Sequence, residues 1–347
     1  MPWEVHMKIG EVYFIGERDR STGELTPNVK IGKASGDEGS LERLKDHQTG
    51  NPRDLELHHV SQTPAPFWVE NGLHQRLSSL RVRNEWHKLS AGELSDAIAL
   101  AESLSKETFK HYPFIEEQER LKSMISNGET SAPTEESTDW HMRLCKAHTQ
   151  LNQIKDLTSA YSLVISKLDE DDLEQAQEED LVLIEHYAHG TFDAEGFNQK
   201  YPQLIEEFTT HETVISGTLS PKYRKFQISE IDPELETFSA SFLDLCSGVS
   251  NKTATFVELH DLFSEVQYRE NVLNWEKEIA VAHLASICGT NSGIEGQITW
   301  NRSEKVKTKV DLEALETEYS KEFSAFYSVA MKTRQKRRKR AQRQVNE

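Results

Sequence analysis

The sequence predicts an α/β domain at the N-terminus, with a small mixed or antiparallel sheet flanked by helices, followed by a mostly α-helical region that ends in a basic tail. Three observations predict this arrangement. Apolar residues alternate in two segments near the N-terminus, as they do in half-buried strands. From Trp140 onward apolar residues recur at helical spacing, beside strongly acidic stretches. Eight basic residues and no acidic ones lie between Lys332 and Arg343.

The first sixty residues predict three strands and one helix. Apolar side chains alternate at residues 12–14 and again at 29–31, which predicts a hairpin whose connecting loop, residues 17–28, is polar. Residues 40–48 predict a short helix that begins near a serine cap and ends before a glycine and a proline. Residues 55–60 predict the third strand.

The next elements complete the predicted domain. Residues 66–80 predict a helix, because apolar residues recur every fourth position from Val69 to Leu77 on one face. Residues 85–89 predict a last short strand, and residues 93–104 predict a further helix.

The remainder divides by composition. Residues 127–138 contain no apolar side chain except Ala132, which predicts a linker. We therefore expect a first domain over residues 8–110, a helix and polar linker over 111–138, an acidic and mainly helical region over 139–331, and a basic tail over 332–347.

Two segments of the acidic region resemble each other. Residues 192–208 and 310–326 place an aspartate, a glutamate, a tyrosine and a final phenylalanine at identical offsets. A duplicated helical hairpin would explain the match, and so would ordinary helix-start chemistry. Residues 296–300 and 305–310 predict a small hairpin. A final helix is expected to start near Asp311 and to continue into the basic tail.

Charge, cysteine spacing and the length of apolar runs limit the classes of protein to which the chain can belong. The 347 residues carry a net charge of −18, but residues 1–90 hold 12 basic and 13 acidic residues, so the acid is concentrated between that segment and the tail. The three cysteines, Cys145, Cys246 and Cys288, are far apart and fit neither a disulfide framework nor a zinc site. With no signal peptide and no long apolar run, we expect a cytoplasmic protein.

The order of motifs in residues 10–90 resembles that of the GIY-YIG nuclease superfamily. The first motif contains Tyr13, and the second reads Lys30-Ile31-Gly32, as in the phage and bacterial branch that includes the T5 phage orf172-like DNA-binding or nuclease domain. A helix carrying Arg43 and His47 follows, and Glu70 lies on the next helix. The resemblance covers about a quarter of the chain and implies hydrolysis of DNA phosphodiester bonds.

Phosphodiester hydrolysis needs a positioned water, a base and cations around the phosphorus. The resemblance implies that Glu70 holds one Mg²⁺ or Mn²⁺ ion, that Arg43 binds the scissile phosphate with its two-pronged guanidinium, and that His47 assists there. Tyr13 would help to activate water. Lys30 replaces the usual second tyrosine, and could orient the nucleophile or lower the pKa of the tyrosine.

Further candidates complete the predicted site. His74 lies one turn after Glu70 and could support it or belong to the surface, and the resemblance aligns Asn84 with a late asparagine of the family. Each residue alone is more often structural, since a tyrosine in a strand is usually packing and a Glu–His pair at this spacing is usually an ordinary helical pair. Nucleic-acid contacts are expected from Lys33 and from the tail residues Lys332, Arg334, Lys336, Arg337, Arg338, Lys339, Arg340 and Arg343.

The sequence thus favours a metal-dependent DNA endonuclease of phage, mobile-element or anti-phage defence biology. The main alternative is a catalytically silent DNA-binding module that recruits a protein partner through its acidic helices. A third is a scaffold whose tail binds RNA or an anionic membrane. The acidic region could also fold back on the tail and restrain the nuclease.

Overall fold

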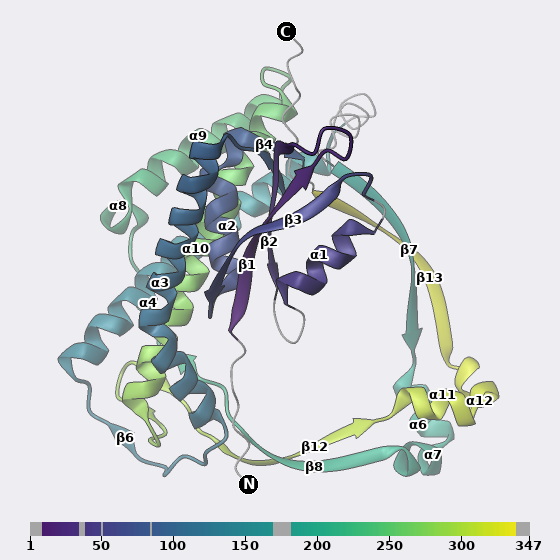
Figure 1. The fold of residues 1–347 in the computed structure, drawn as a ribbon. Coiled ribbons are helices and arrows are strands. Elements are labelled where there is room, and N and C mark those ends of the chain that lie inside the picture. Colours follow the sequence, from purple (N-terminus) through teal and green to yellow (C-terminus); the bar gives the residue numbers. More distant parts are fainter. Residues whose placement is uncertain (1–8, 35–38, 50, 84, 169–181, 338–347) are drawn as a thin grey trace.

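The N-terminal part of the chain forms a five-stranded antiparallel sheet (Figure 1). The computed structural model describes residues 9–34, 39–49, 51–83, 85–168 and 182–337. In spatial order the strands are β3 (Asp54–Thr63), β1 (Gly10–Arg18), β2 (Leu25–Ala34), β5 (Trp86–Lys88) and β4 (Arg81–Arg83). β1 pairs with β2 through the two segments of alternating apolar residues, so the predicted hairpin is confirmed.

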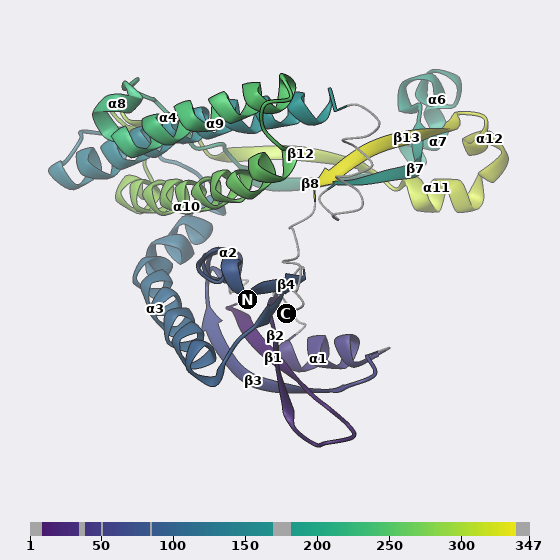
Figure 2. The ribbon, with the colours of Figure 1, turned by 90° about the horizontal axis from the view of Figure 1, so that it is seen from above.

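Helices cover both faces of this sheet (Figure 2). They are α1 (Ser40–Gln48), α2 (Pro66–Arg76) and α3 (Ala91–Lys122). Val12 and Phe14 lie in the core formed with α2 and α3, whereas Tyr13 and Ile15 lie on the opposite face, where α1 packs. Successive side chains of a strand point to opposite faces. Functional residues on neighbouring strand positions are therefore presented to different helices.

The predicted elements of this domain are confirmed, most of them with changed bounds. α1 has the expected bounds, but α2 ends at Arg76, and the expected last turn is a separate 3₁₀ helix, η1 (Ser78–Leu80). β4 was not predicted. α3 begins with a capping box between Ser90 and Glu93 and continues well beyond the predicted end, through Pro113. His111 before that proline and Phe114 after it both contact His283 of α10 (Phe256–Cys288), which stabilises the helix across it.

The second half of the chain is mainly helical, as predicted. Its long helices form one layer beside the N-terminal domain (Figure 2). These are α4 (Glu135–Ile165), α9 (Pro233–Ser250) and α10, and the short α8 (Ile228–Ile231) precedes α9. Tyr161, Phe242 and Phe263 are buried between them, with the rings of Tyr161 and Phe263 stacked 3.9 Å apart. α10 also contacts α2 and α3, so it connects the two halves.

The predicted linker is a fixed connection in the structure. Residues 127–138 contain β6 (Thr130–Ser131), which joins a four-stranded sheet, and the start of α4, capped by Thr134. The other strands of that sheet are β10 (Gly293–Ile294), β11 (Ile298–Thr299) and β9 (Ser220–Pro221). The predicted hairpin between residues 296–300 and 305–310 is wrong, because β11 pairs with β9 and β10 instead.

Two long β-ribbons project from the helical layer and meet at a cluster of short helices (Figure 1). We call residues 182–216 and 303–337 the arm. Its first half contains β7 (Val182–Phe192), α6 (Ala194–Lys200), α7 (Pro202–Glu207) and β8 (Thr209–Ser216). Its second half contains β12 (Ser303–Val310), α11 (Leu312–Glu318), α12 (Ser320–Ser324) and β13 (Tyr327–Arg337). β8 pairs with β12, and β7 pairs with β13.

The two similar sequence segments occupy equivalent places in the arm. Each half is a strand, two short helices and a strand. Asp193 caps α6 by accepting a hydrogen bond from Gly196, and Asp311 caps α11 in the same way. The N–H of Asp193 donates to the carbonyl of Phe326 at 2.9 Å, and that of Asp311 donates to Phe208 at 2.9 Å. These reciprocal bonds are what a duplicated unit related by a pseudo-twofold axis would make.

The sequence predicted one helix from Asp311 into the basic tail, and the second part of that prediction is wrong. The chain leaves the helical conformation after α12 and continues as β13, which contains Lys332, Arg334, Lys336 and Arg337. Lysine and arginine favour helices locally, but the pairing of β13 with β7 along the whole strand overrides that preference. Arg338, Lys339, Arg340 and Arg343 lie outside the described residues.

A buried histidine joins the N-terminal domain to the helical layer and predicts a pH-dependent stability. The ring of His283 lies between Phe114 and Trp140, 3.7 Å from each centroid, and its Nε2 is 3.2 Å from Nδ1 of His111. Burial lowers the pKa of His283 to about 4. The unfolded chain therefore binds a proton near pH 6.5 that the folded chain excludes, so stability is present above that pH and is lost as the pH falls toward 4.

We expect His283 to contribute about 2 kcal/mol to the loss of unfolding free energy between pH 7.5 and pH 4.5. Urea unfolding of the native chain, of His283→Gln and of His211→Gln, an exposed control, measures this directly. The pH dependence should be smaller in His283→Gln and unchanged in His211→Gln. Parallel pH profiles for all three proteins would contradict the assignment.

Candidate active site

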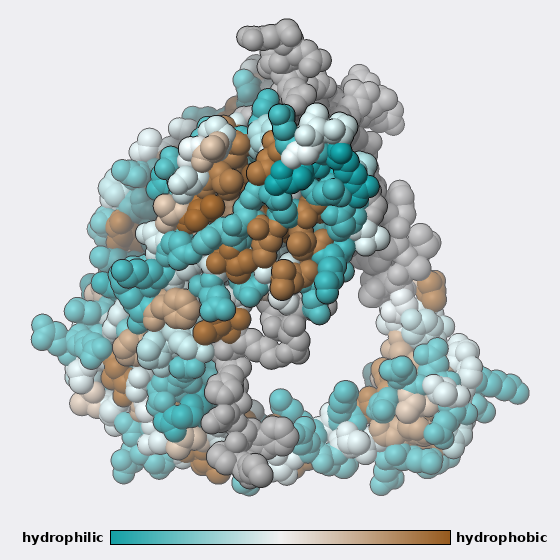
Figure 3. Space-filling model, in the orientation of Figure 1, coloured by the Kyte–Doolittle hydropathy of each residue, from teal (hydrophilic) through white to brown (hydrophobic). Residues whose placement is uncertain are grey.

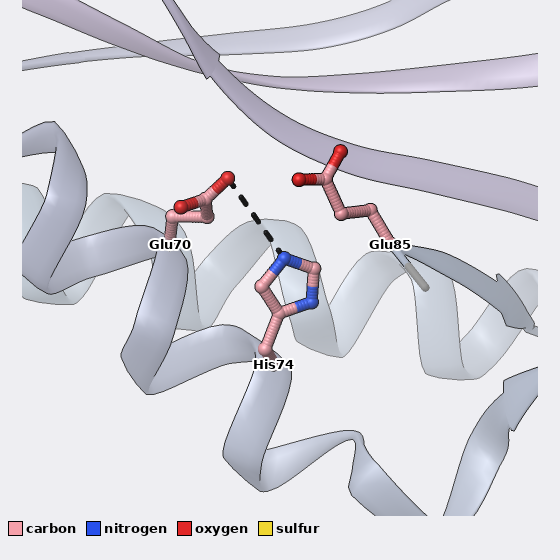
Figure 4. A group of neighbouring side chains, drawn as sticks. All are labelled: Glu70, His74 and Glu85. Carbon is pink, nitrogen blue, oxygen red and sulfur yellow. Dashed lines mark ion pairs between the residues drawn. The ribbon is translucent and has the colours of Figure 1, made fainter. Parts of the chain in front are cut away.

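Two carboxylates and an imidazole meet at the edge of the N-terminal sheet. Glu70 and His74 are one turn apart on α2, and Glu85 comes just before β5. One ligand atom from each lies within 4.8 Å of the others, and Nε2 of His74 is 3.9 Å from an oxygen of Glu70 (Figure 4). Glu70 and His74 are 4% and 2% exposed. Their position follows from Val69 and Leu73, which anchor α2 in the core.

Lysines from β2 pair with both carboxylates. Lys33 donates to Glu70 at 2.6 Å and lies over the ring of Phe67, and Lys30 donates to Glu85. Nearby carboxylates in a buried place repel each other unless cations offset their charge. Positions 30 and 33 face opposite sides of the sheet. Lys30 lies on the α1 face, and Lys33 lies on the α2 face, where it contacts Glu70. Because Glu85 pairs with Lys30 and also lies close to Glu70, it connects the two faces.

Tyr13 and His47 form a second group on the α1 face. The hydroxyl of Tyr13 lies 3.2 Å from Nε2 of His47, and Tyr13 is 3% exposed. Gly32 lies against this hydroxyl: a β-carbon there would come within 2.5 Å of it. The glycine of the second motif therefore makes room for the tyrosine of the first. Arg43, on the same helix as His47, is only partly buried and can reach a ligand.

Burial and nearby charges shift the pKa of both members of this pair. Burial raises the pKa of Tyr13 to about 12, and the charge of Glu85 adds to the effect, whereas Arg43 opposes it. Lys30 pairs with Glu85, and its two expected roles, orienting the nucleophile or lowering the pKa of the tyrosine, stay predictions. Burial, and then the charge of Lys30, lowers the pKa of His47. The pair is thus a protonated phenol beside a neutral imidazole at pH 7.

The carboxylate cluster opens into a cleft of about 1050 Å³ between the N-terminal domain and α10. Glu70, His74 and Glu85 line one wall. The facing wall includes the acidic residues Asp261, Glu265 and Glu270 of α10. Glu265 accepts a hydrogen bond from Gln75 of α2, which ties the walls together. Lys33 and Arg81 also line the cleft, so a phosphate entering it would meet acid on both walls and these two cations beside it.

The donor set fits a hard divalent cation. Mg²⁺ and Mn²⁺ prefer carboxylate oxygen, which Glu70 and Glu85 offer, and the imidazole of His74 is a ligand that Mn²⁺ accepts more readily than Mg²⁺. The predicted site included Glu70 and His74. It did not include Glu85, although Glu85 is the acidic residue next to Asn84 in the last motif. Asn84 lies outside the described residues. Lys33 contacts Glu70 at the site, whereas Lys332, Arg334, Lys336 and Arg337 lie far along the chain in the arm.

Comparison with known proteins identifies the part of the chain that contains this site. No curated protein and no solved structure matches the chain. Among the residues that the structure describes, no helix is long and apolar enough to cross a membrane. One family model matches, over residues 10–102 or about a quarter of the chain: that of the T5orf172 domain, a nuclease-associated domain.

Proposed function

We propose that residues 10–102 form a metal-dependent endonuclease that hydrolyses DNA phosphodiester bonds, as would suit phage biology or defence against phage. The observation that carries the proposal is the convergence of Glu70, His74 and Glu85 within 4.8 Å, at a cleft in a domain matched by a nuclease-associated family. A divalent cation at this point would add positive charge between the buried Glu70 and the partly exposed Glu85, beyond that of the lysines that pair with them.

Each remaining residue has a role that its position supports. One Mg²⁺ or Mn²⁺ ion held by Glu70, Glu85 and His74 would supply positive charge for the phosphate and the leaving oxygen. Neutral His47 can accept a proton passed through the hydroxyl of Tyr13 from the attacking water. Arg43 would grip the scissile phosphate. Lys33 and Lys30 keep the carboxylates in place until the cation binds.

One observation favours the silent DNA-binding alternative: both carboxylates already pair with lysines, which can neutralise them permanently. Incubation of supercoiled plasmid with the native chain in Mg²⁺, Mn²⁺ or EDTA separates the two functions. The nuclease is supported if the plasmid is nicked or linearised in either cation but not in EDTA, and if this activity co-elutes with the protein on a sizing column. Retained DNA binding without cleavage in either cation would support a silent module that recruits partners through its acidic helices.

Glu85 gives a specific prediction within this function. Glu85→Gln should raise the Mn²⁺ concentration needed for half-maximal cleavage by about tenfold or more, because a ligand or its close support is lost. Isothermal titration with Mn²⁺ should show the same weakening without any DNA present. Glu42→Gln, which removes an exposed carboxylate from α1, is the control. Equal Mn²⁺ affinities for the two variants would remove Glu85 from the site.

A further inference from the structure

The ribbon formed by β8 and β12 is exposed along nearly its whole length. Seven of the eight residues of β12 are exposed, including Val306 at 65%. Two-stranded ribbons are only marginally stable by themselves in water, and Figures 1 and 3 show this one extending away from the helical layer. A ribbon maintained in this form is well suited to contact a partner.

One face of the ribbon is basic. Lys305, Lys307 and Lys309 occupy alternate positions of β12, so their side chains share a face. The residues directly opposite them on β8 are Val214, Glu212 and Thr210. Three cations against one acid on a single face is a local excess of positive charge, in a chain whose net charge is −18.

The spacing and shape of this face fit a nucleic-acid backbone. Alternate residues of a strand are about 6.8 Å apart, close to twice the 3.4 Å rise per nucleotide of each DNA strand. A row of three lysines can therefore follow the phosphates of one strand. A two-stranded β-ribbon is also narrow enough to enter the major groove, which is about 12 Å wide.

We propose that the Lys305–Lys307–Lys309 face of the β8–β12 ribbon binds the phosphate backbone of duplex DNA. The inference rests on the proposed function, because it names where the arm would hold the nucleic acid that the N-terminal domain acts on. A second copy of the chain is a weaker occupant. It would bring another 18 negative charges overall, and its ribbon would bring three more lysines to the same face.

The experiment measures binding separately from cleavage. Fluorescence anisotropy of a labelled 30-base-pair duplex is recorded in EDTA with the full chain, over 50–300 mM NaCl. The test variant is Lys305→Gln/Lys307→Gln/Lys309→Gln. The control, Lys106→Gln/Lys146→Gln/Lys155→Gln, changes net charge equally at exposed lysines of α3 and α4. A triple lysine-to-arginine variant at 305, 307 and 309 preserves the charge.

We expect the test variant to bind at least about tenfold more weakly at 100 mM salt, and its slope of log Kd against log salt to fall by about 2 to 3. The arginine variant should bind like the native chain, and the control should change much less. Equal losses in test and control variants would overturn the proposal. So would unchanged DNA binding with loss of a dimer in sedimentation, or tighter competition by RNA hairpins than by duplex DNA.

The two proposals can fail separately. A chain that binds duplex DNA through the ribbon and cuts no plasmid in Mg²⁺ or Mn²⁺ would refute the nuclease and support the arm. A chain that cuts plasmid, and whose DNA binding is unchanged when the three lysines are replaced, would support the nuclease and refute the role of the arm.

Discussion

Replacing Glu70 by glutamine should lower kcat for plasmid cleavage at least about a thousandfold while duplex binding in EDTA is retained. Glu70 is buried, lies 3.9 Å from His74, and contributes to the cluster that would hold the cation. A catalytic metal ion supplies several kcal/mol of transition-state stabilisation, and about 4 kcal/mol corresponds to a factor of about a thousand. Glutamine has nearly the same shape but no charge, so the fold should be preserved.

The control for this substitution is Glu234→Gln, an exposed carboxylate on α9 that removes the same charge. Thermal unfolding should show both variants folded, and titration with Mn²⁺ should show weakened binding only for Glu70→Gln. Cleavage at native rate by the folded Glu70→Gln variant would exclude this cluster as the active centre. Loss of both cleavage and duplex binding would instead assign Glu70 a structural role at the cleft.

The N-terminal elements could be predicted from the sequence because local signals and burial agree there. The alternation of Val12 and Phe14 predicts which face of β1 is buried, and this face packs on α2. Pro66 marks the first turn of α2. The arm could not be predicted, because its strands acquire their conformation by pairing with partners about 90 to 155 residues away. β7 is aligned with β13 and β8 with β12, and no local pattern encodes these partners.

The candidate site likewise contains some residues that could be predicted from local motifs and others that only the tertiary fold brings there. The order of motifs predicted Tyr13, His47 and Glu70, and the structure brings Tyr13 and His47 to 3.2 Å of each other. Glu85 was not predicted, because only the fold, through its place just before β5, brings it beside Glu70 and His74 of α2. The acidic wall of the cleft was missed for a similar reason: α10 is distant in sequence, and only tertiary packing brings Glu265 opposite Gln75.

Substituting phenylalanine for Tyr13 should lower kcat by about 10²- to 10⁴-fold, the usual range for loss of a proton-transferring group. The phenol lies 3.2 Å from His47, and its pKa, raised to about 12 by burial, keeps it protonated at neutral pH. In the proposed reaction it would therefore relay a proton to His47 and would not act as a free phenolate. Burial lowers the pKa of His47, so the imidazole is neutral and able to accept that proton.

The pH profile of cleavage distinguishes this relay from a phenolate base. For a relay, kcat should fall on the acidic side as His47 becomes protonated, at a pH below the ordinary histidine value of 6.5, and should be level from pH 7 to 9. A phenolate base with a pKa of about 12 would instead give a tenfold increase per pH unit throughout that interval.

Gly32→Ala tests the geometry of the same pair without removing any of its groups. The added methyl would lie 2.5 Å from the hydroxyl of Tyr13, so the tyrosine ring or the backbone must shift, and the 3.2 Å contact with His47 should be disturbed. Cleavage should fall with that displacement, while Tyr223→Phe, which alters a tyrosine that is 39% exposed, should cut at the native rate. A folded Gly32→Ala variant with undiminished kcat would show that the contact between Tyr13 and His47 is packing and takes no part in proton transfer.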